Sequence, residues 1–398
     1  MTTASSPEDV RNRMVDSILT GHHLTPAVEE AMRTVPRHEF VPGATIEKAY
    51  ADEAVTIKEN PAGGLALSCA SVPSLVGDML VQLDARPGDR VAEIGAGTGY
   101  NAALLAHIVG PEGDMTTIDI DLDVTAHARR RLDATGYQRV RVLSRDGSLG
   151  SPEYAPFAGI VVTVGAWDLP WAWHDQLADG GRLVVPLRWR GQTRSIAFIR
   201  QSDLLVSDSA ILCGFVPMIG HDGELTGAID PDALVTLYWD KDQAIDPDAL
   251  QGVLALPGTV QGSGVTVGGM DPFDGIWLRL AATDPATCRI AAERAAVDSG
   301  LCSPAIPVRS PALVDGDSLV YLTKRRLPTE PRWELTATWH GPTGQHLADR
   351  LCEAIRTWDK DREAVPVITA YPAGIADEVL GGVYVVDKPG ARLAFAYS

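Results

Sequence analysis

The segment at residues 91–100 constrains this chain more than any other. An apolar stretch ends in Gly95, Gly97 and Gly99 and then leads into a helical pattern over residues 101–109. A strand that ends in closely spaced glycines lets a ligand lie against bare backbone, because glycine has no Cβ to hold it off. The segment therefore predicts a nucleotide-like cofactor and makes an enzyme the first hypothesis.

The spacing of the glycines narrows the choice of cofactor. Dinucleotide-binding loops follow the pattern G-x-G-x-x-G, whereas here Gly99 comes one position early, in the G-x-G-x-G form usual for S-adenosylmethionine enzymes. Asp119, at the end of the next short strand, can accept hydrogen bonds from both ribose hydroxyls, although nicotinamide enzymes share that device. Asp146 and Gly147, after a third strand, suit an acceptor for the adenine amino group. The three strand ends together favour the methyl donor.

Strands and helices alternate through the first half of the chain, which predicts an α/β fold with a parallel sheet. Residues 193–200 and 204–215 follow with no helix between them and are expected to form an antiparallel hairpin at the sheet edge. This arrangement is the one expected of the Rossmann-like sheet of class I S-adenosylmethionine-dependent methyltransferases, since a dinucleotide-binding sheet would continue parallel. The parallel strands are expected at residues 90–94, 115–119, 138–143, 159–164 and 182–187.

The length of 398 residues predicts more than one domain. We expect a methyltransferase domain over residues 1–222, with N-terminal helices within residues 1–60, and an accessory α+β domain over residues 223–398. A heptapeptide that recurs at residues 228–234 and 244–250 places Asp before Pro, which is typical of a helix start. In the second domain strands are expected at residues 275–280, 319–322, 333–339 and 382–386, and helices at 286–298 and 344–358.

Composition limits the partners. The formal net charge of −18 repels phosphate backbones, so nucleic acid is not expected as a partner. Five scattered cysteines without a C-x-x-C pair indicate reduced thiols and no metal site. The N-terminus lacks the pattern of a signal peptide and no long apolar run is present, so a cytoplasmic protein without a membrane span is expected.

Six motifs in one order carry a resemblance to a family. They lie at residues 35–42 (VPRHEFVP), 50–54 (YADEA), 71–73 (SVP), 93–100 (EIGAGTGY), 146–147 (DG) and 181–186 (GRLVVP). Over roughly residues 10–220 the chain resembles the protein-L-isoaspartate O-methyltransferases.

The resemblance implies that S-adenosyl-L-methionine is the methyl donor and that Ser71 is the catalytic residue, close to a substrate carboxylate. Without the resemblance, Ser71 could also be the N-cap of a helix beginning at Ser74. The tryptophans at 167, 171 and 173 follow the fourth strand and suit either peptide contact or core packing. The expected donor-binding residues are Ser68, Cys69, Ala70, Ser71, Glu93, Gly95, Ala96, Gly97, Gly99, Asp119, Ile120, Asp146, Gly147 and Thr163.

The second domain makes the chain similar to longer homologues associated with ribosomally made, modified peptides of the lanthipeptide and graspetide type. That resemblance implies methylation of an Asp side chain in a precursor peptide, followed by aspartimide or isoaspartate formation, with residues 223–398 recognising the peptide. General repair of isoaspartyl residues is an alternative, and so is a non-catalytic binding subunit with the cofactor fold. The precursor, the need for prior macrocyclisation, the final product and the oligomeric state are left open by the sequence.

Overall fold

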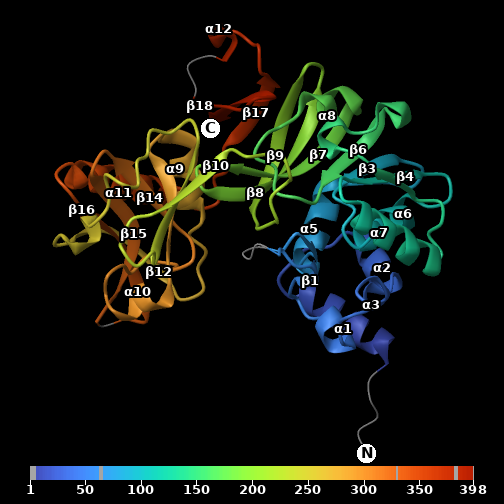
Figure 1. Ribbon diagram of the computed structural model, residues 1–398, viewed down its shortest axis with the longest axis horizontal. Coiled ribbons are helices and arrows are strands. Elements are labelled where there is room, and N and C mark those ends of the chain that lie inside the picture. The colour runs from blue at the N-terminus through green and yellow to red at the C-terminus, as the bar shows by residue number, and fades with distance from the viewer. Residues whose placement is uncertain (1–5, 62–65, 329, 381–383, 398) are drawn as a thin grey trace, which may run out of the picture.

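Two large β-sheets organise the chain in the computed structural model, which describes residues 6–61, 66–328, 330–380 and 384–397. A ten-stranded mixed sheet lies beside a seven-stranded antiparallel sheet, with the chain's last strands returning to the first sheet (Figure 1). Among the described residues, no helix has the length and apolar character needed to cross a membrane.

The centre of the large sheet is parallel, as the alternation of strands and helices predicts. The carboxyl ends of these parallel strands all lie at one edge of the sheet, which is the position where open α/β sheets bind ligands. In spatial order the parallel strands are β7 (Leu177–Trp189), β6 (Phe157–Val162), β3 (Arg90–Ile94), β4 (Asp114–Asp119) and β5 (Arg141–Ser144).

The expected hairpin forms, but it is not the edge of the sheet. β8 (Gln192–Gln201) and β9 (Leu204–Leu212) pair antiparallel beside β7. Three more antiparallel strands then continue the sheet in the order β17 (Val367–Pro372), β19 (Ala391–Ala396) and β18 (Tyr384–Asp387). A division at residue 223 therefore does not separate two sheets, because residues 367–396 belong with the strands of the first half.

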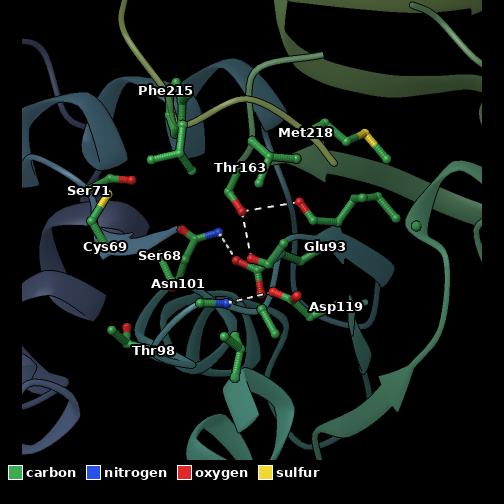
Figure 2. A pocket seen from close by; sticks show the side chains of 18 of the residues that line it. Ser68, Cys69, Ser71, Glu93, Thr98, Asn101, Asp119, Thr163, Phe215 and Met218 are labelled. Atoms are coloured by element: carbon green, nitrogen blue, oxygen red, sulfur yellow. Dashed lines mark hydrogen bonds between the residues drawn. The ribbon is translucent and has the colours of Figure 1, made fainter. Parts of the chain in front are cut away.

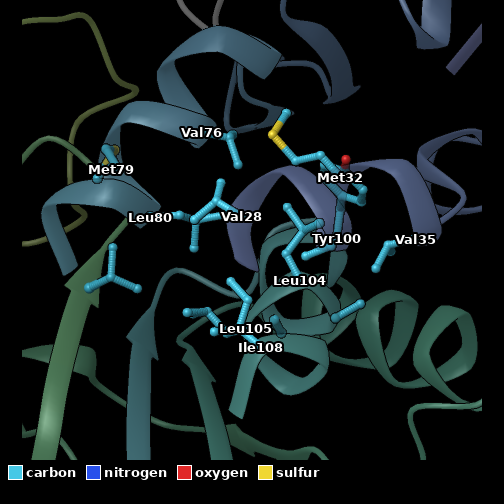
Figure 3. Packing of buried hydrophobic residues seen from close by; sticks show 14 of the residues in the cluster. Val28, Met32, Val35, Val76, Met79, Leu80, Tyr100, Leu104, Leu105 and Ile108 are labelled. Carbon is cyan, nitrogen blue, oxygen red and sulfur yellow. The ribbon is translucent and has the colours of Figure 1, made fainter. Parts of the chain in front are cut away.

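The N-terminal helices pack on helices that cover one face of this sheet. Ser6 caps the first helix in a reciprocal capping box with Asp9, and Thr25 caps the second directly before Pro26. Figure 3 shows Val28 and Met32 packed against Leu80 and Leu104. The longer helices that contribute to this core are α1 (Pro7–Ile18), α2 (Pro26–Thr34), α5 (Pro73–Leu83), α6 (Tyr100–Val109) and α7 (Leu122–Ala134).

Short elements complete the first half of the chain. They are α3 (Arg37–Phe40), α4 (Ile46–Ala49), β1 (Val55–Lys58), β2 (Ser68–Ala70), η1 (Gly147–Leu149), η2 (Pro152–Tyr154) and α8 (Trp171–Gln176). β1 and β2 form a separate antiparallel pair.

The second sheet is antiparallel throughout. Its strands lie in the order β10 (Glu224–Ala228), β11 (Val235–Asp240), β13 (Thr287–Ala292), β14 (Ser310–Asp315), β15 (Ser318–Arg326), β16 (Arg332–His340) and β12 (Thr259–Gly268). The other elements of this half are η3 (Val253–Ala255), α9 (Gly275–Thr283), α10 (Arg294–Asp298), α11 (Gly344–Lys360) and α12 (Asp377–Leu380).

Three expectations for this half are wrong. Residues 275–280 form the helix α9 rather than a strand, because its apolar residues face two different cores and leave no polar stripe to reveal a helical period. Residues 286–298 form the strand β13 and the short helix α10 rather than one helix. The repeated heptapeptides make turns rather than helices, with Asp230 and Asp246 each accepting a hydrogen bond from the amide two residues on. Of the strand expected at residues 382–386, residues 382 and 383 lie outside the described part.

Candidate active site

A pocket lies at the carboxyl ends of β3, β4 and β6, between the glycine loop and a segment that follows β9. Figure 2 shows Ser71 and Cys69 on one side of the pocket and Glu93 and Asp119 across from them, with Phe215 above. Residues distant in the sequence thus share one cavity.

The glycine loop requires glycine at its first two positions. Gly95 has a φ of 104°, and an added Cβ would lie 2.6 Å from Thr163 Oγ1, whose hydroxyl donates to the Gly95 carbonyl. Gly97 has a φ of 49°, and its added Cβ would lie 3.7 Å from Cys69 O. Gly97 lines the pocket, so a side chain at either position would strain the backbone or occupy the cavity.

Gly99 has a different role from the one expected. It is not among the residues that line the pocket; it is the N-cap of α6, with a φ of 85°. An added Cβ would lie 3.3 Å from the Cα of Ala128 in α7. The third glycine therefore permits the close packing of two helices.

Glu93 is a buried carboxyl group behind the loop. Its Oε1 accepts from Asn101 Nδ2 at 2.8 Å and its Oε2 accepts from Thr117 Oγ1 at 2.6 Å. Burial raises the pKa of Glu93 to about 7, although both hydrogen bonds oppose the shift. Glu93 therefore ties β3, β4 and the start of α6 together beneath the pocket.

Asp119 ends β4 and presents a carboxylate to the pocket. Its Oδ2 accepts from the Gly97 amide at 3.4 Å and its Oδ1 accepts from the Asp121 amide at 3.0 Å, while burial raises the pKa of Asp119. Asp146 also lines the pocket, and its Oδ1 is held by the Ser148 amide at 2.9 Å. Both carboxylates are oriented by backbone and can still accept further hydrogen bonds.

Ser71 lies outside α5 and does not cap it. The N-cap is Val72, which makes no side-chain cap bond, and Asp52 accepts from both the amide and the hydroxyl of Ser74 at 2.8 Å. Among the described residues, no hydrogen-bond partner of Ser71 Oγ is found, whereas the Ser71 carbonyl accepts from Arg37 Nη2 at 2.8 Å. The hydroxyl thus stays available at the pocket wall.

All of the expected donor-binding residues line this pocket except Gly99. Other lining residues were not expected, among them Arg37, Asn101 and residues 215–219. Arg37 lies in the motif at residues 35–42, to which the sequence alone assigns no function. Residues 215–219 reach the pocket only through the tertiary structure, so no local sequence pattern identifies them. Within the described part of the chain, no group of three or more His, Cys, Asp or Glu side chains could hold a metal ion.

The three tryptophans after β6 are not among the residues that line the pocket, and their surroundings differ. Trp173 is fully buried and donates from Nε1 to the Gly147 carbonyl at 2.9 Å. Trp171 stacks on His174 with ring centroids 4.4 Å apart. Trp167 is buried against the second sheet, where Nε1 donates to Asp240 at 2.9 Å.

Comparisons with known proteins agree with this geometry. The sequence profile described as protein-L-isoaspartate(D-aspartate) O-methyltransferase matches residues 10–223. The protein-L-isoaspartate O-methyltransferase of Methanopyrus kandleri is 37% identical over 221 residues, covering 54% of this chain and 92% of the relative. That of Methanoregula boonei is 38% identical over 224 residues, covering 56% of this chain and 99% of the relative.

A solved structure titled protein-L-isoaspartate O-methyltransferase superposes with a TM-score of 0.51 at 18% identity, covering 90% of this chain and 96% of that chain, which shows a shared fold. The family match spans more than half of the chain and includes the glycine loop, Asp119 and Ser71. The chain therefore belongs to the protein-L-isoaspartate(D-aspartate) O-methyltransferase family and is an enzyme that uses S-adenosyl-L-methionine as its methyl donor.

Proposed function

We propose that the chain methylates the free carboxylate of L-isoaspartyl residues in damaged proteins and peptides. The observation that carries the proposal is the presence of the Ser71 hydroxyl in the same pocket as the glycine loop and Asp119. A donor-binding half and a carboxylate-binding half then share one cavity, as transfer between two bound groups requires.

The residues of the pocket fit the donor. Asp119 would accept from the ribose hydroxyls and Asp146 from the adenine amino group, while the bare backbone at Gly95 and Gly97 would lie against the nucleoside. When bound, the donor supplies an electrophilic methyl group on a positively charged sulfur.

The chain's own residues then have a limited chemical task. A carboxyl group with a pKa near 4 is already ionised at neutral pH, so no general base is needed. The Ser71 hydroxyl would donate a hydrogen bond to one carboxylate oxygen and leave the other aligned for attack. The apolar wall formed by Phe215 and Met218 would help exclude water from the reacting groups.

A second candidate is methylation of an ordinary Asp in a ribosomally made, modified peptide. The observation that favours it is the second sheet, which lies beyond the residues matched by the family and offers surface for recognising one peptide. Selecting one Asp among many needs contacts beyond the carboxylate.

A two-substrate assay separates these functions. Pairs of peptides with the same sequence, containing either isoaspartate or aspartate, are incubated with tritium-labelled donor, and mass spectrometry follows methyl ester and imide formation. Repair predicts turnover of isoaspartyl peptides with unrelated sequences and none of their aspartyl twins. Turnover of a single aspartyl sequence would instead support peptide tailoring. Donor binding without methylation of any peptide would contradict both and support a binding subunit.

A further inference from the structure

The pocket is covered by a segment that leads from the first sheet to the second. We call residues 213–222 the strap. Phe215, Val216, Pro217, Met218 and Ile219 all line the pocket. Because the strap is not part of a helix or a strand, its position depends on what it is bonded to.

The strap is bonded to the loop that follows β6. The Gly165 amide donates to the Val216 carbonyl at 2.7 Å, and the Met218 amide donates to the Gly165 carbonyl at 3.0 Å. Two residues earlier, the Thr163 hydroxyl donates to the Gly95 carbonyl of the glycine loop. The loop thus joins the strap to the expected donor-binding backbone.

The same loop is held from its other side by the C-terminal half of the chain. Trp167 Nε1 donates to Asp240 Oδ1 at 2.9 Å, and Lys388 Nζ lies 3.8 Å from the centroid of the Trp167 ring. Lys388 Nζ also lies 3.5 Å from Asp240 Oδ2 and donates to the Arg188 carbonyl at 3.0 Å. We call Trp167, Asp240 and Lys388 the Trp167 cluster; all three are buried, so its contacts are shielded from water.

Two close approaches fix the Trp167 cluster against the strap and the last strands. An added Cβ at Gly223, directly after the strap, would lie 1.8 Å from the Trp167 ring. Asp168 Oδ1 accepts from the Gly390 amide at 2.8 Å, in the turn between β18 and β19. The loop is therefore clamped between the end of the strap, β11 and the β18–β19 turn.

We infer that Asp240 and Lys388, which lie outside the region matched by the family, are positioning residues that hold the strap over the donor pocket through Trp167. The inference concerns donor binding alone and does not depend on which carboxylate is methylated. In this arrangement the C-terminal half of the chain supports the strap, which forms a wall of the pocket, in addition to any contact with a substrate.

The test uses the full chain and two variants. Trp167→Phe keeps an aromatic ring but removes the donor to Asp240, and Lys388→Met keeps the length of the side chain but removes its charge. The matched control is Trp189→Phe, since buried Trp189 also links the two halves, through Nε1 to the Ala281 carbonyl at 3.2 Å and through its ring to Phe395 of β19. Each protein is studied well below its own unfolding midpoint.

Two readouts follow the strap directly. Without ligand, hydrogen exchange of peptides covering residues 213–222 is expected to be faster in both cluster variants than in the wild type and the control. The dissociation constant for S-adenosylhomocysteine, measured by calorimetry, is expected to rise roughly tenfold in both variants and to stay unchanged in Trp189→Phe. Wild-type exchange and affinity in both cluster variants would overturn the inference, as would an equal loosening of the strap by Trp189→Phe. Neither readout needs a substrate. A failure of the proposed repair function can therefore be distinguished from a failure of this inference.

Discussion

Asp52 and Ser71 have different roles at the start of α5. Asp52 satisfies the Ser74 amide, a task that an N-cap side chain normally performs, and the Ser71 hydroxyl is left to face the pocket. Arg37 Nη2 donates to the Ser71 carbonyl at 2.8 Å. The orientation of Ser71 therefore depends on partners distant in the sequence.

Ser71→Ala is expected to lower kcat/KM roughly tenfold to a hundredfold, the worth of one hydrogen bond to a charged group. Binding of S-adenosylhomocysteine should stay unchanged, since the hydroxyl is proposed to act on the substrate carboxylate. Initial rates with an isoaspartyl peptide test the expected loss of kcat/KM, and calorimetry with S-adenosylhomocysteine tests the unchanged binding. Weakened cofactor binding at an unchanged rate would contradict the proposed role.

Glu93 predicts a pH dependence of stability. The pKa of Glu93 is raised from 4.5 to about 7, so the folded state binds this proton more tightly than the unfolded state. The resulting stabilisation is fully present below the unfolded pKa of 4.5 and is lost as the pH rises through about 7.

Urea unfolding of the wild type and Glu93→Gln between about pH 4 and 8 measures this contribution. The unfolding free energy of the wild type should fall relative to the variant by up to about 3 kcal/mol as the pH rises. Parallel curves for the two proteins would show that the carboxyl group keeps an ordinary pKa.

At the level of elements, the sequence predicts helices and strands well where a single hydrophobic period dominates a segment. The parallel strands follow regular alternation, and Gly95 and Asp119 stand at the strand ends that the expected topology brings together. The third glycine of the motif could not be assigned from its spacing alone, because Gly99 packs against α7 instead of lining the pocket. The sequence does not indicate the position of the strap or the helical state of α9, since their surroundings come from segments far away in the chain.

The cap of α5 gives a prediction that separates stability from rate. Asp52→Ala should cost about 1 kcal/mol of unfolding free energy by removing the cap, and it should also lower kcat/KM by loosening the turn that carries Ser71. Ser6→Ala is the matched control, because the Ser6 side chain also accepts from an amide in the first turn of a helix, α1, and lies outside the pocket residues. Denaturant unfolding and initial rates are measured for both. Equal rates in the two variants would show that the cap does not position Ser71.

At the scale of the whole molecule, the helix α9 contributes to the cores of both large sheets. α9 packs Trp277, Leu278 and Ala281 into the core of the large sheet, while Ile276 and Leu280 face the core of the second sheet. Trp277 Nε1 donates to the Arg190 carbonyl at 3.3 Å, and Arg194 pairs with Asp274 at 2.9 Å. The second half is thus part of the support for the first, so removing it tests more than substrate recognition.

A chain ending at residue 222 is expected to be unable to fold stably, even though the family match ends at residue 223. It would lose α9 and β17–β19, expose the edge of β9 and uncover Ile196 and Phe198, both fully buried in the intact chain. The lost core residues include Trp277, Ile368 and Leu393. At about 2 kcal/mol for each large apolar side chain, these losses approach the whole net stability of a typical domain.

The measurement compares soluble yield and circular dichroism of the truncated and full-length chains, with calorimetry of the full-length chain as the control. A single calorimetric transition is expected for the intact protein because the shared α9 couples both cores. A soluble truncated chain with a cooperative transition of its own would show that the first half is self-sufficient. It would then become the direct reagent for asking what the second sheet contributes to donor binding and to the choice of peptide.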